Sequence, residues 1–195
     1  VDYKGNTYLF YHNGALPGGG GFTRSVCVEQ AEFNKDGSIV PLKMTAGIEK
    51  GLETLNPFRK TEAETIAFSE WMKASQNEEV GVFVNAMKDG AYIKVRDVDF
   101  RKEGASRITS LVGTTHNGGV TMEVRADSRE GRLLATLKVP MTGGDNRWAL
   151  VSSEIERITG VHDLYFICKG DKPGRLMYFD YWMFSNCLLY TSDAA

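Results

Sequence analysis

Val120-Thr121-Met122-Glu123-Val124 and Leu134-Ala135-Thr136-Leu137-Lys138-Val139 are short runs rich in β-branched and apolar residues, and a stretch containing Asp127 and Gly131 separates them. Runs of this length bounded by Gly, Asn or Asp are typical of β-strands. The same pattern recurs at Thr7-Tyr8-Leu9-Phe10-Tyr11, Ser25-Val26-Cys27-Val28 and Tyr92-Ile93-Lys94-Val95. The sequence therefore predicts an all-β protein.

The best candidate for a helix is the stretch from Thr61 to Met72. Within it, Thr65-Ile66-Ala67-Phe68 fits a strand equally well, and no clear cap closes the stretch at its end. We therefore predict no helix in this chain.

The composition is that of a globular protein, because 42% of the 195 residues are hydrophobic and 25% are charged. The 23 Lys and Arg residues against 25 Asp and Glu leave a net charge of −2, and no long basic run is present to hold a nucleic acid or an anionic membrane. No apolar run reaches the roughly 18 residues of a membrane-spanning helix. Cys27, Cys168 and Cys187 cannot all pair with one another and lie at no metal-ligand spacing, so we expect ordinary thiols.

The chain divides between Lys50 and Pro57. Before the division, a hairpin pattern ends in Asn34-Lys35-Asp36-Gly37, a turn signal in which Gly supplies a positive φ at low cost. After it, strands recur as in a β-sandwich with a single core, whereas 187–195 has no such pattern. We predict domains at 1–52 and 57–186, followed by an unstructured tail at 187–195. The start Val1-Asp2-Tyr3-Lys4 is neither an initiator Met nor a signal peptide, so we expect the natural N-terminus to lie upstream.

Three motifs of the first domain occur in the order of a known family: Tyr3-Lys4-Gly5-Asn6-Thr7-Tyr8-Leu9-Phe10-Tyr11-His12, Gly21-Phe22-Thr23-Arg24-Ser25-Val26 and Asn34-Lys35-Asp36-Gly37-Ser38-Ile39. They resemble the closing blade of the five-bladed β-propeller of glycoside hydrolase family 43. The resemblance implies that His12 and Arg24 lie near a sugar pocket, whereas an isolated blade favours a strand end and a surface Arg. It also implies that the catalytic acid and base lie on earlier blades, so we expect this chain to be inactive by itself, with the missing blades as its partners.

The second domain carries five motifs in order: Thr61-Glu62-Ala63-Glu64, then Asp89-Gly90-Ala91-Tyr92-Ile93 with Val98-Asp99-Phe100, then Gly131-Arg132-Leu133-Leu134-Ala135-Thr136, then Val139-Pro140-Met141-Thr142-Gly143-Gly144, and finally Gly160-Val161-His162-Asp163-Leu164-Tyr165 leading to Phe179-Asp180-Tyr181-Trp182. They resemble a family 6 carbohydrate-binding module, a β-jelly-roll appended to family 43 arabinofuranosidases and xylosidases. The resemblance implies binding to plant cell-wall polysaccharide such as xylan or arabinoxylan. It also implies an extracellular, periplasmic or cell-surface location.

Glu62 and Glu64 stand two residues apart, so on a strand both side chains point to one face. Carboxylate oxygens on one face suit a hard cation such as Ca²⁺, although a solvated strand face has the same pattern. The resemblance adds Asp180 as a third ligand and makes a structural calcium ion the better hypothesis. Catalysis by these carboxylates is disfavoured, because no second, differently tuned acid lies near them in sequence.

Sugar recognition needs flat apolar ring faces together with a few polar groups. At the positions that the resemblance assigns to the sugar cleft stand Phe83, Asp145 and Tyr178, where Tyr or Trp, Trp, and Asn are usual. These departures predict weak binding in that cleft. Trp71, in an expected loop, is an additional candidate for stacking on a sugar. Tyr92 faces the second site used by some members, but it is more simply an ordinary sheet residue.

Three functions remain in competition: a binding module that tethers a hemicellulase, a β-domain that braces the enzyme without binding sugar, and part of an active glycosidase. The last requires a full propeller, which the first domain is too short to supply. His162-Asp163 is not expected to be a catalytic dyad, because adjacent residues of a strand point to opposite faces and no nucleophile motif accompanies them.

Overall fold

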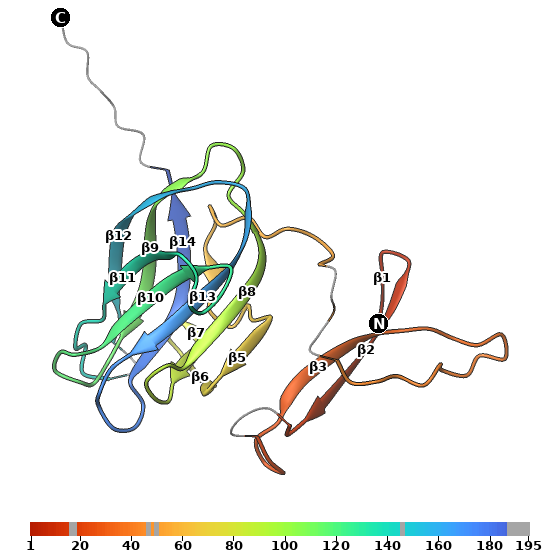
Figure 1. Ribbon diagram of the computed structural model, residues 1–195. Coiled ribbons are helices and arrows are strands. Elements are labelled where there is room, and N and C mark those ends of the chain that lie inside the picture. Colours follow the sequence, from red (N-terminus) through yellow and green to blue (C-terminus); the bar gives the residue numbers. More distant parts are fainter. Residues whose placement is uncertain (16–18, 46–47, 49–50, 145–146, 187–195) are drawn as a thin grey trace, which may run out of the picture. The chain divides into compact units, whose positions relative to one another are not determined.

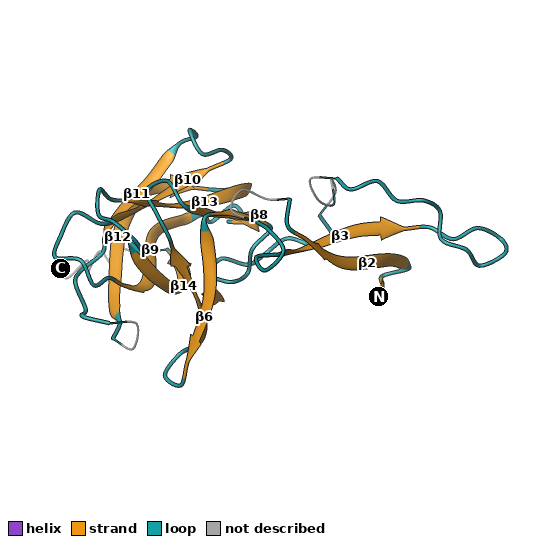
Figure 2. Cartoon of the chain, turned by 90° about the horizontal axis from the view of Figure 1, so that it is seen from below, coloured by secondary structure: helices purple, strands orange, loops and turns teal. Residues whose placement is uncertain are grey.

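The structure is a computed structural model that describes residues 1–15, 19–45, 48, 51–144 and 147–186. It divides into two compact units, Val1–Leu52 and Glu53–Ala195. Over the described ranges every regular element is a strand, as predicted (Figure 2). No helix there is long and apolar enough to cross a membrane. The tail predicted at 187–195, with Cys187, lies outside the described residues.

The strands are β1 (Asp2–Tyr3), β2 (Asn6–Asn13), β3 (Ser25–Ala31), β4 (Thr61–Glu62), β5 (Phe68–Glu70), β6 (Met72–Asn77), β7 (Gly81–Ala86), β8 (Tyr92–Asp99), β9 (Ala105–Gly113), β10 (Thr121–Ala126), β11 (Leu133–Lys138), β12 (Ala149–Ile158), β13 (Val161–Lys169) and β14 (Met177–Ser185). Five of the predicted runs fall in β2, β3, β8, β10 and β11. The stretch from Thr61 to Met72 forms no helix, as predicted, and contains β4, β5 and the first residue of β6.

The first unit is an antiparallel sheet of order β1-β2-β3. Its longest pairing runs from Thr7 opposite Ala31 to Asn13 opposite Ser25. The segment after the hairpin is tied back to β3, because the Glu29 carboxylate accepts hydrogen bonds from the Thr45 amide at 2.7 Å and the Thr45 hydroxyl at 2.8 Å. The predicted turn ending at Gly37 is present, with φ of 84° at that residue.

The second unit is a β-sandwich, as predicted (Figure 1). One sheet has the order β11-β10-β13-β8-β5, and the other has the order β12-β9-β14-β7-β6 with β4 paired to β14. Every pairing within these two sheets is antiparallel. Antiparallel sheets that bury one face put alternate residues of each strand into the core.

The core follows this alternation. In β8, Ile93 and Val95 are buried between the sheets, whereas Lys94 points to the outer face of its sheet. From the opposite sheet, Trp182 and Phe184 of β14 enter the same core. Cys168 is also buried there, and burial raises the pKa of its thiol to about 12.

A β-bulge interrupts β14. The register with β9 shifts between Phe179 and Tyr181, so Asp180 has no direct partner on β9. A bulge leaves one residue unpaired and re-aims its side chain. The bulge turns the Asp180 carboxylate toward β4 and into a buried position.

Candidate functional site

An aromatic cluster lies on the face of the second sheet that points away from the core. Phe83 of β7 and Tyr178 of β14 meet the indole of Trp148, with ring centroids 5.1 Å and 5.2 Å from it and nearly perpendicular planes. Edge-to-face contact is a favourable arrangement for aromatic pairs. Gly113 permits the cluster, because a Cβ at that position would overlap the edge of the Tyr178 ring.

The structure brings Phe83 and Tyr178 together, as the sequence predicts, but buries both rings. Each side chain is only 1% exposed, so neither ring face is open to solvent. The Tyr178 hydroxyl lies 2.8 Å from the Thr142 hydroxyl, which ties Thr142 to the cluster. Asp145, the other predicted cleft residue, lies outside the described residues.

Polar groups surround this cluster. Arg175 lies over the Tyr178 ring, with its guanidinium carbon 5.5 Å from the ring centroid, and donates to Asn85 Oδ1 at 3.3 Å. Asn85 in turn donates to the Ser75 hydroxyl at 2.8 Å. Among the described residues nothing accepts a hydrogen bond from the buried Nε1 of Trp148. The cluster therefore has an apolar base and donors around it, which is the composition of a sugar site.

Trp71 stands where the chain passes from β5 in one sheet to β6 in the other. Its φ is 56°, a left-handed conformation that is an outlier for a bulky residue, and its side chain is 37% exposed. The Lys88 ammonium lies 3.6 Å from the centroid of the indole ring. Strained backbone around a half-exposed aromatic is a feature that clusters at binding sites.

Tyr92 is an ordinary sheet residue, which was the simpler interpretation of the sequence. Its side chain is buried, and the Arg129 guanidinium covers its ring with the carbon atom 4.6 Å from the centroid. Phe68 and Tyr165 flank it, with centroids 6.1 Å and 6.0 Å away. No open ring face remains at Tyr92 for a sugar.

The predicted metal ligands lie where β4 pairs with β14. Glu62 is opposite Tyr181, next to the bulged Asp180. The interpretation that Glu62 and Glu64 share a strand face is wrong, because β4 ends at Glu62 and Glu64 lies in the following turn. Over the described ranges, no three His, Cys, Asp or Glu side chains gather closely enough to hold a metal ion.

The carboxylates of Glu62 and Asp180 are incompletely satisfied. Glu62 Oε2 and Asp180 Oδ1 are buried and have no hydrogen-bond partner among the described residues. The pKa of Asp180 is raised to about 6 by burial and by the negative charges of Glu62 and Glu64, although Lys60 opposes this shift. Two buried carboxylate oxygens without partners suit a hard cation such as Ca²⁺, because this ion prefers oxygen ligands.

Sequence reasoning missed Lys60, which is the only cation recorded within ion-pair distance of Asp180 over the described ranges. Its Nζ lies 3.0 Å from Glu62 Oε1 and 3.9 Å from Asp180 Oδ2. Lys60 directly precedes β4, which begins at Thr61, so strand alternation alone does not place its side chain beside Glu62.

In the first unit, the structure brings His12 and Arg24 together as an exposed pair. Arg24 Nη1 donates to His12 Nε2 at 2.9 Å, and Arg24 Nε donates to the Gly21 carbonyl at 3.0 Å. The Arg24 side chain is thus engaged with its own hairpin. Both residues are exposed to solvent in this unit.

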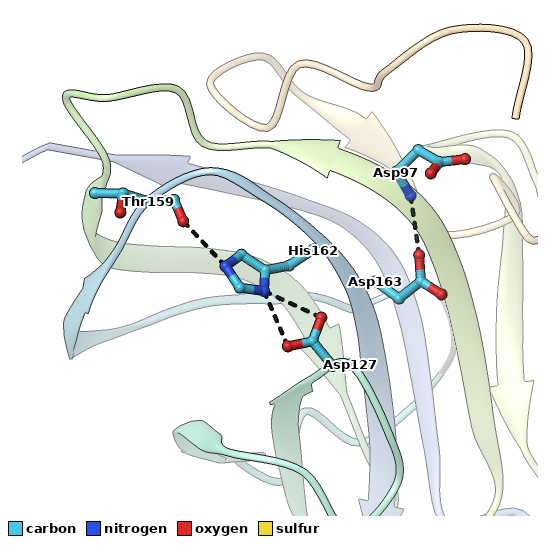
Figure 3. A network of polar contacts seen from close by, with 5 residues as sticks. All are labelled: Asp97, Asp127, Thr159, His162 and Asp163. Carbon is cyan, nitrogen blue, oxygen red and sulfur yellow. Dashed lines mark hydrogen bonds and ion pairs between the residues drawn. The ribbon is translucent and has the colours of Figure 1, made fainter.

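His162 and Asp163 have different partners, as expected for adjacent strand residues (Figure 3). His162 Nδ1 lies 3.0 Å from both carboxylate oxygens of Asp127, and Nε2 lies 3.0 Å from the Thr159 carbonyl. Asp163 accepts from the Asp97 amide at 3.1 Å and pairs with Lys94 at 2.8 Å. These contacts tie loops and strands together and present no nucleophile.

Comparison with known proteins agrees with the resemblance found in the sequence. Residues 62–186 match the profile of the carbohydrate binding module, family 6. The chain is 34% identical over 195 aligned positions to an arabinoxylan arabinofuranohydrolase of Bacillus subtilis, and the match covers 95% of this chain and 37% of that protein. The chain therefore spans little more than a third of the length of this relative.

Solved structures give the same result. The structure of a glycoside hydrolase family 43 arabinoxylan arabinofuranohydrolase from Bacillus subtilis, in complex with cellotetraose, matches 95% of this chain and 40% of that one, with 34% identity and a TM-score of 0.79. A family 6 module from Clostridium cellulolyticum, in complex with xylose, matches 68% of this chain and all of that one, with 28% identity and a TM-score of 0.63. The sandwich is thus the jelly-roll of this family.

Proposed function

This chain belongs to family 6 of the carbohydrate-binding modules, and we propose that it attaches a hemicellulose-degrading enzyme to xylan or arabinoxylan of the plant cell wall. Its similarity to a family 43 arabinoxylan arabinofuranohydrolase over both units supports this parent enzyme. An enzyme that acts on cell-wall polysaccharide works outside the cytoplasm, so we propose an extracellular, periplasmic or cell-surface location.

In this proposal the first unit is the closing blade of the parent propeller. Phe22 and Val26 are highly exposed, and Phe10 is more than half exposed. Exposed apolar side chains concentrated in one small unit indicate a surface that other segments cover. The remaining blades of the parent chain are the proposed cover, and His12 and Arg24 are the residues of this unit proposed to lie near its sugar pocket.

The observation that carries the sugar-binding proposal is Trp71. It is a Trp held 37% exposed by a left-handed backbone, with the Lys88 ammonium over one face of the indole ring, 3.6 Å from the centroid. In this proposal a pyranose packs the apolar face of its ring against the indole face that Lys88 does not cover, and the Lys88 ammonium donates to sugar hydroxyl groups at the ring edge. Phe83, Tyr178 and Asp145, the residues that the resemblance assigns to the family cleft, are proposed to belong to a separate site around Trp148.

Isothermal titration with xylohexaose tests this site. Because Phe83 and Tyr178 offer no open ring face, we expect the parent chain to bind with a Kd in the millimolar range. Stacking on one aromatic face contributes about 0.5 to 1.5 kcal/mol, so Trp71→Ala should weaken binding by roughly two- to ten-fold. Leu150→Ala, which truncates an exposed apolar residue of β12, is the matched control and should bind like the parent.

The second candidate site is the Phe83–Trp148–Tyr178 cluster, favoured by the buried Nε1 of Trp148, which has no hydrogen-bond partner in the part of the chain that the structure describes. Equal affinity of Trp71→Ala and the parent, with loss of binding in Trp148→Ala, would place the sugar there instead. No binding by the parent to any xylo-oligosaccharide would favour the remaining hypothesis, a domain that only braces the enzyme.

We also propose a structural calcium ion held by Glu62 and Asp180, with Glu64 of the following turn joining them as the third ligand when the ion binds. The two buried carboxylate oxygens without partners support this proposal, as does the raised pKa of Asp180. A bound divalent cation would remove the repulsion among these carboxylates and join β4 to β14. A ligand that binds only the folded state raises its stability by mass action.

A further inference from the structure

We propose that Lys60 is the built-in counter-cation of the Glu62 and Asp180 carboxylates, which keeps the module folded without calcium and weakens its affinity for calcium. The proposal rests on the calcium site proposed above and assigns a role to a residue outside that ligand set. Three features support this role: the position of the Lys60 ammonium, the two carboxylate oxygens that it does not contact, and the negative charges around it.

The Lys60 ammonium lies close to two carboxylates and one aromatic ring. Its Nζ lies 3.0 Å from Glu62 Oε1, 3.9 Å from Asp180 Oδ2 and 4.6 Å from the centroid of the Tyr181 ring. An ammonium over an aromatic face is attracted by the ring quadrupole, so Tyr181 holds the charge beside the carboxylates. Lys60 is half-exposed, whereas the Asp180 side chain is only 1% exposed.

The Lys60 ammonium lies near one oxygen of each carboxylate and does not contact the other. Glu62 Oε1 and Asp180 Oδ2 lie near the ammonium, whereas Glu62 Oε2 and Asp180 Oδ1 are buried and have no hydrogen-bond partner within the described ranges. The ammonium therefore reduces the repulsion between the carboxylates and leaves one oxygen of each without a partner among the described residues. A buried carboxylate that lacks any counter-charge is strongly destabilising, so this charge supports the metal-free fold.

The same charge opposes a divalent cation. A calcium ion held by the Glu62 and Asp180 carboxylates would share these ligands with the Lys60 ammonium, and like charges that share ligands repel appreciably even in a partly solvated site. The number of charges around a calcium site sets its affinity. Removal of the positive charge at residue 60 should therefore strengthen calcium binding and weaken the metal-free protein.

The test compares Lys60→Met, Lys60→Gln and the charge-conserving Lys60→Arg with the parent chain. Calcium affinity is measured by isothermal titration with CaCl₂, and the melting midpoint is measured with chelator and with saturating calcium. We expect calcium affinity to rise about ten-fold in Lys60→Met and Lys60→Gln, and their midpoints in chelator to fall. Lys60→Arg should stay within about three-fold of the parent affinity, because it keeps the positive charge.

Lys138→Met, which removes an exposed ammonium from β11 in the other sheet, controls for the change in net charge and should leave the calcium affinity unaltered. Calcium binding by the parent with unchanged or weaker affinity in both neutral variants overturns the role of Lys60 and leaves the calcium site intact. Absence of calcium binding in the parent and in every variant overturns the site, and the role of Lys60 falls with it. Equal gains in Lys138→Met and Lys60→Met also overturn the proposal, because the effect would then be one of net charge.

Discussion

At the scale of the residue, the ion pair of Lys94 and Asp163 offers the clearest link between charge and stability. Lys94 Nζ lies 2.8 Å from Asp163 Oδ2, and Asp163 also accepts from the Asp97 amide. Burial alone would raise the pKa of Asp163, but the hydrogen bonds from Lys94 and the Asp97 amide and the positive charges of Lys94 and Arg96 lower it below its usual value. A carboxyl group with a lowered pKa stabilises the fold above its unfolded-state pKa and loses that contribution as the pH falls through its folded-state pKa.

We therefore expect Asp163→Asn to lower the free energy of unfolding by about 1 to 2 kcal/mol at pH 7. The difference from the parent should shrink as the pH falls below 4, because the parent carboxylate then becomes protonated and loses the same interactions. Urea unfolding at pH 7, 5 and 3 measures this. Asp171→Asn, which alters an exposed carboxylate beside Lys172, is the control and should change stability little. A destabilisation of equal size at all three pH values would contradict the charge-based account.

For the segment between β5 and β6, substitutions of Trp71 distinguish the cost of its backbone conformation from its contribution to sugar binding. The left-handed φ of this residue costs a side chain with a Cβ roughly 1 kcal/mol and costs Gly almost nothing. We expect Trp71→Gly to be more stable than Trp71→Ala by about 1 kcal/mol, although neither variant should bind xylohexaose as the parent does. The order should reverse at Val82, an exposed position within β7, where Val82→Gly should be less stable than Val82→Ala. Thermal melting of the four variants measures both differences, and a Trp71→Gly protein less stable than Trp71→Ala would contradict the strain.

The strands show why sequence predicts some elements and not others. Tyr92–Val95 was predictable because its residues alternate between core and outer face, a property of the strand alone. The end of β4 at Glu62 was not, because the length of this strand is set by its pairing with β14, which lies far along the chain. The separation of Glu64 from the strand face follows from that pairing.

The candidate site likewise has some features that the sequence predicts and others that it does not. The types of residue that take part, aromatic rings and carboxylates, were predictable from the motifs that contain Phe83, Tyr178, Glu62 and Asp180. Their exposure was not predictable, because Phe83 and Tyr178 are covered by Trp148, which lies more than sixty positions after Phe83 in the sequence. Burial that arises from contacts between distant segments leaves no mark in local composition.

At the scale of the whole molecule, the two units differ in how much apolar surface they bury. The hydrophobic core extends from Ala63 to Phe184 and belongs entirely to the second unit. Tyr8 and Ala31 are the buried hydrophobic residues of the described part of the first unit. A small sheet with so little buried surface is marginal by itself, whereas a sandwich with a continuous core folds independently.

We therefore expect residues 53–186, produced alone, to melt within about 2 °C of the full chain, because every interaction of the core is retained. The calorimetric enthalpy should also be nearly the same, since enthalpy of unfolding scales with the number of residues in the cooperative structure, at about 0.7 kcal/mol per residue. The peptide 1–52 should give no cooperative transition by circular dichroism. A fall of more than about 5 °C in the midpoint of 53–186, or an enthalpy lower in proportion to the residues removed, would mean that the first unit unfolds together with the sandwich. Such a result would make the stability of the module depend on the segment that precedes it, and a parent enzyme would then couple its two domains through residues 1–52.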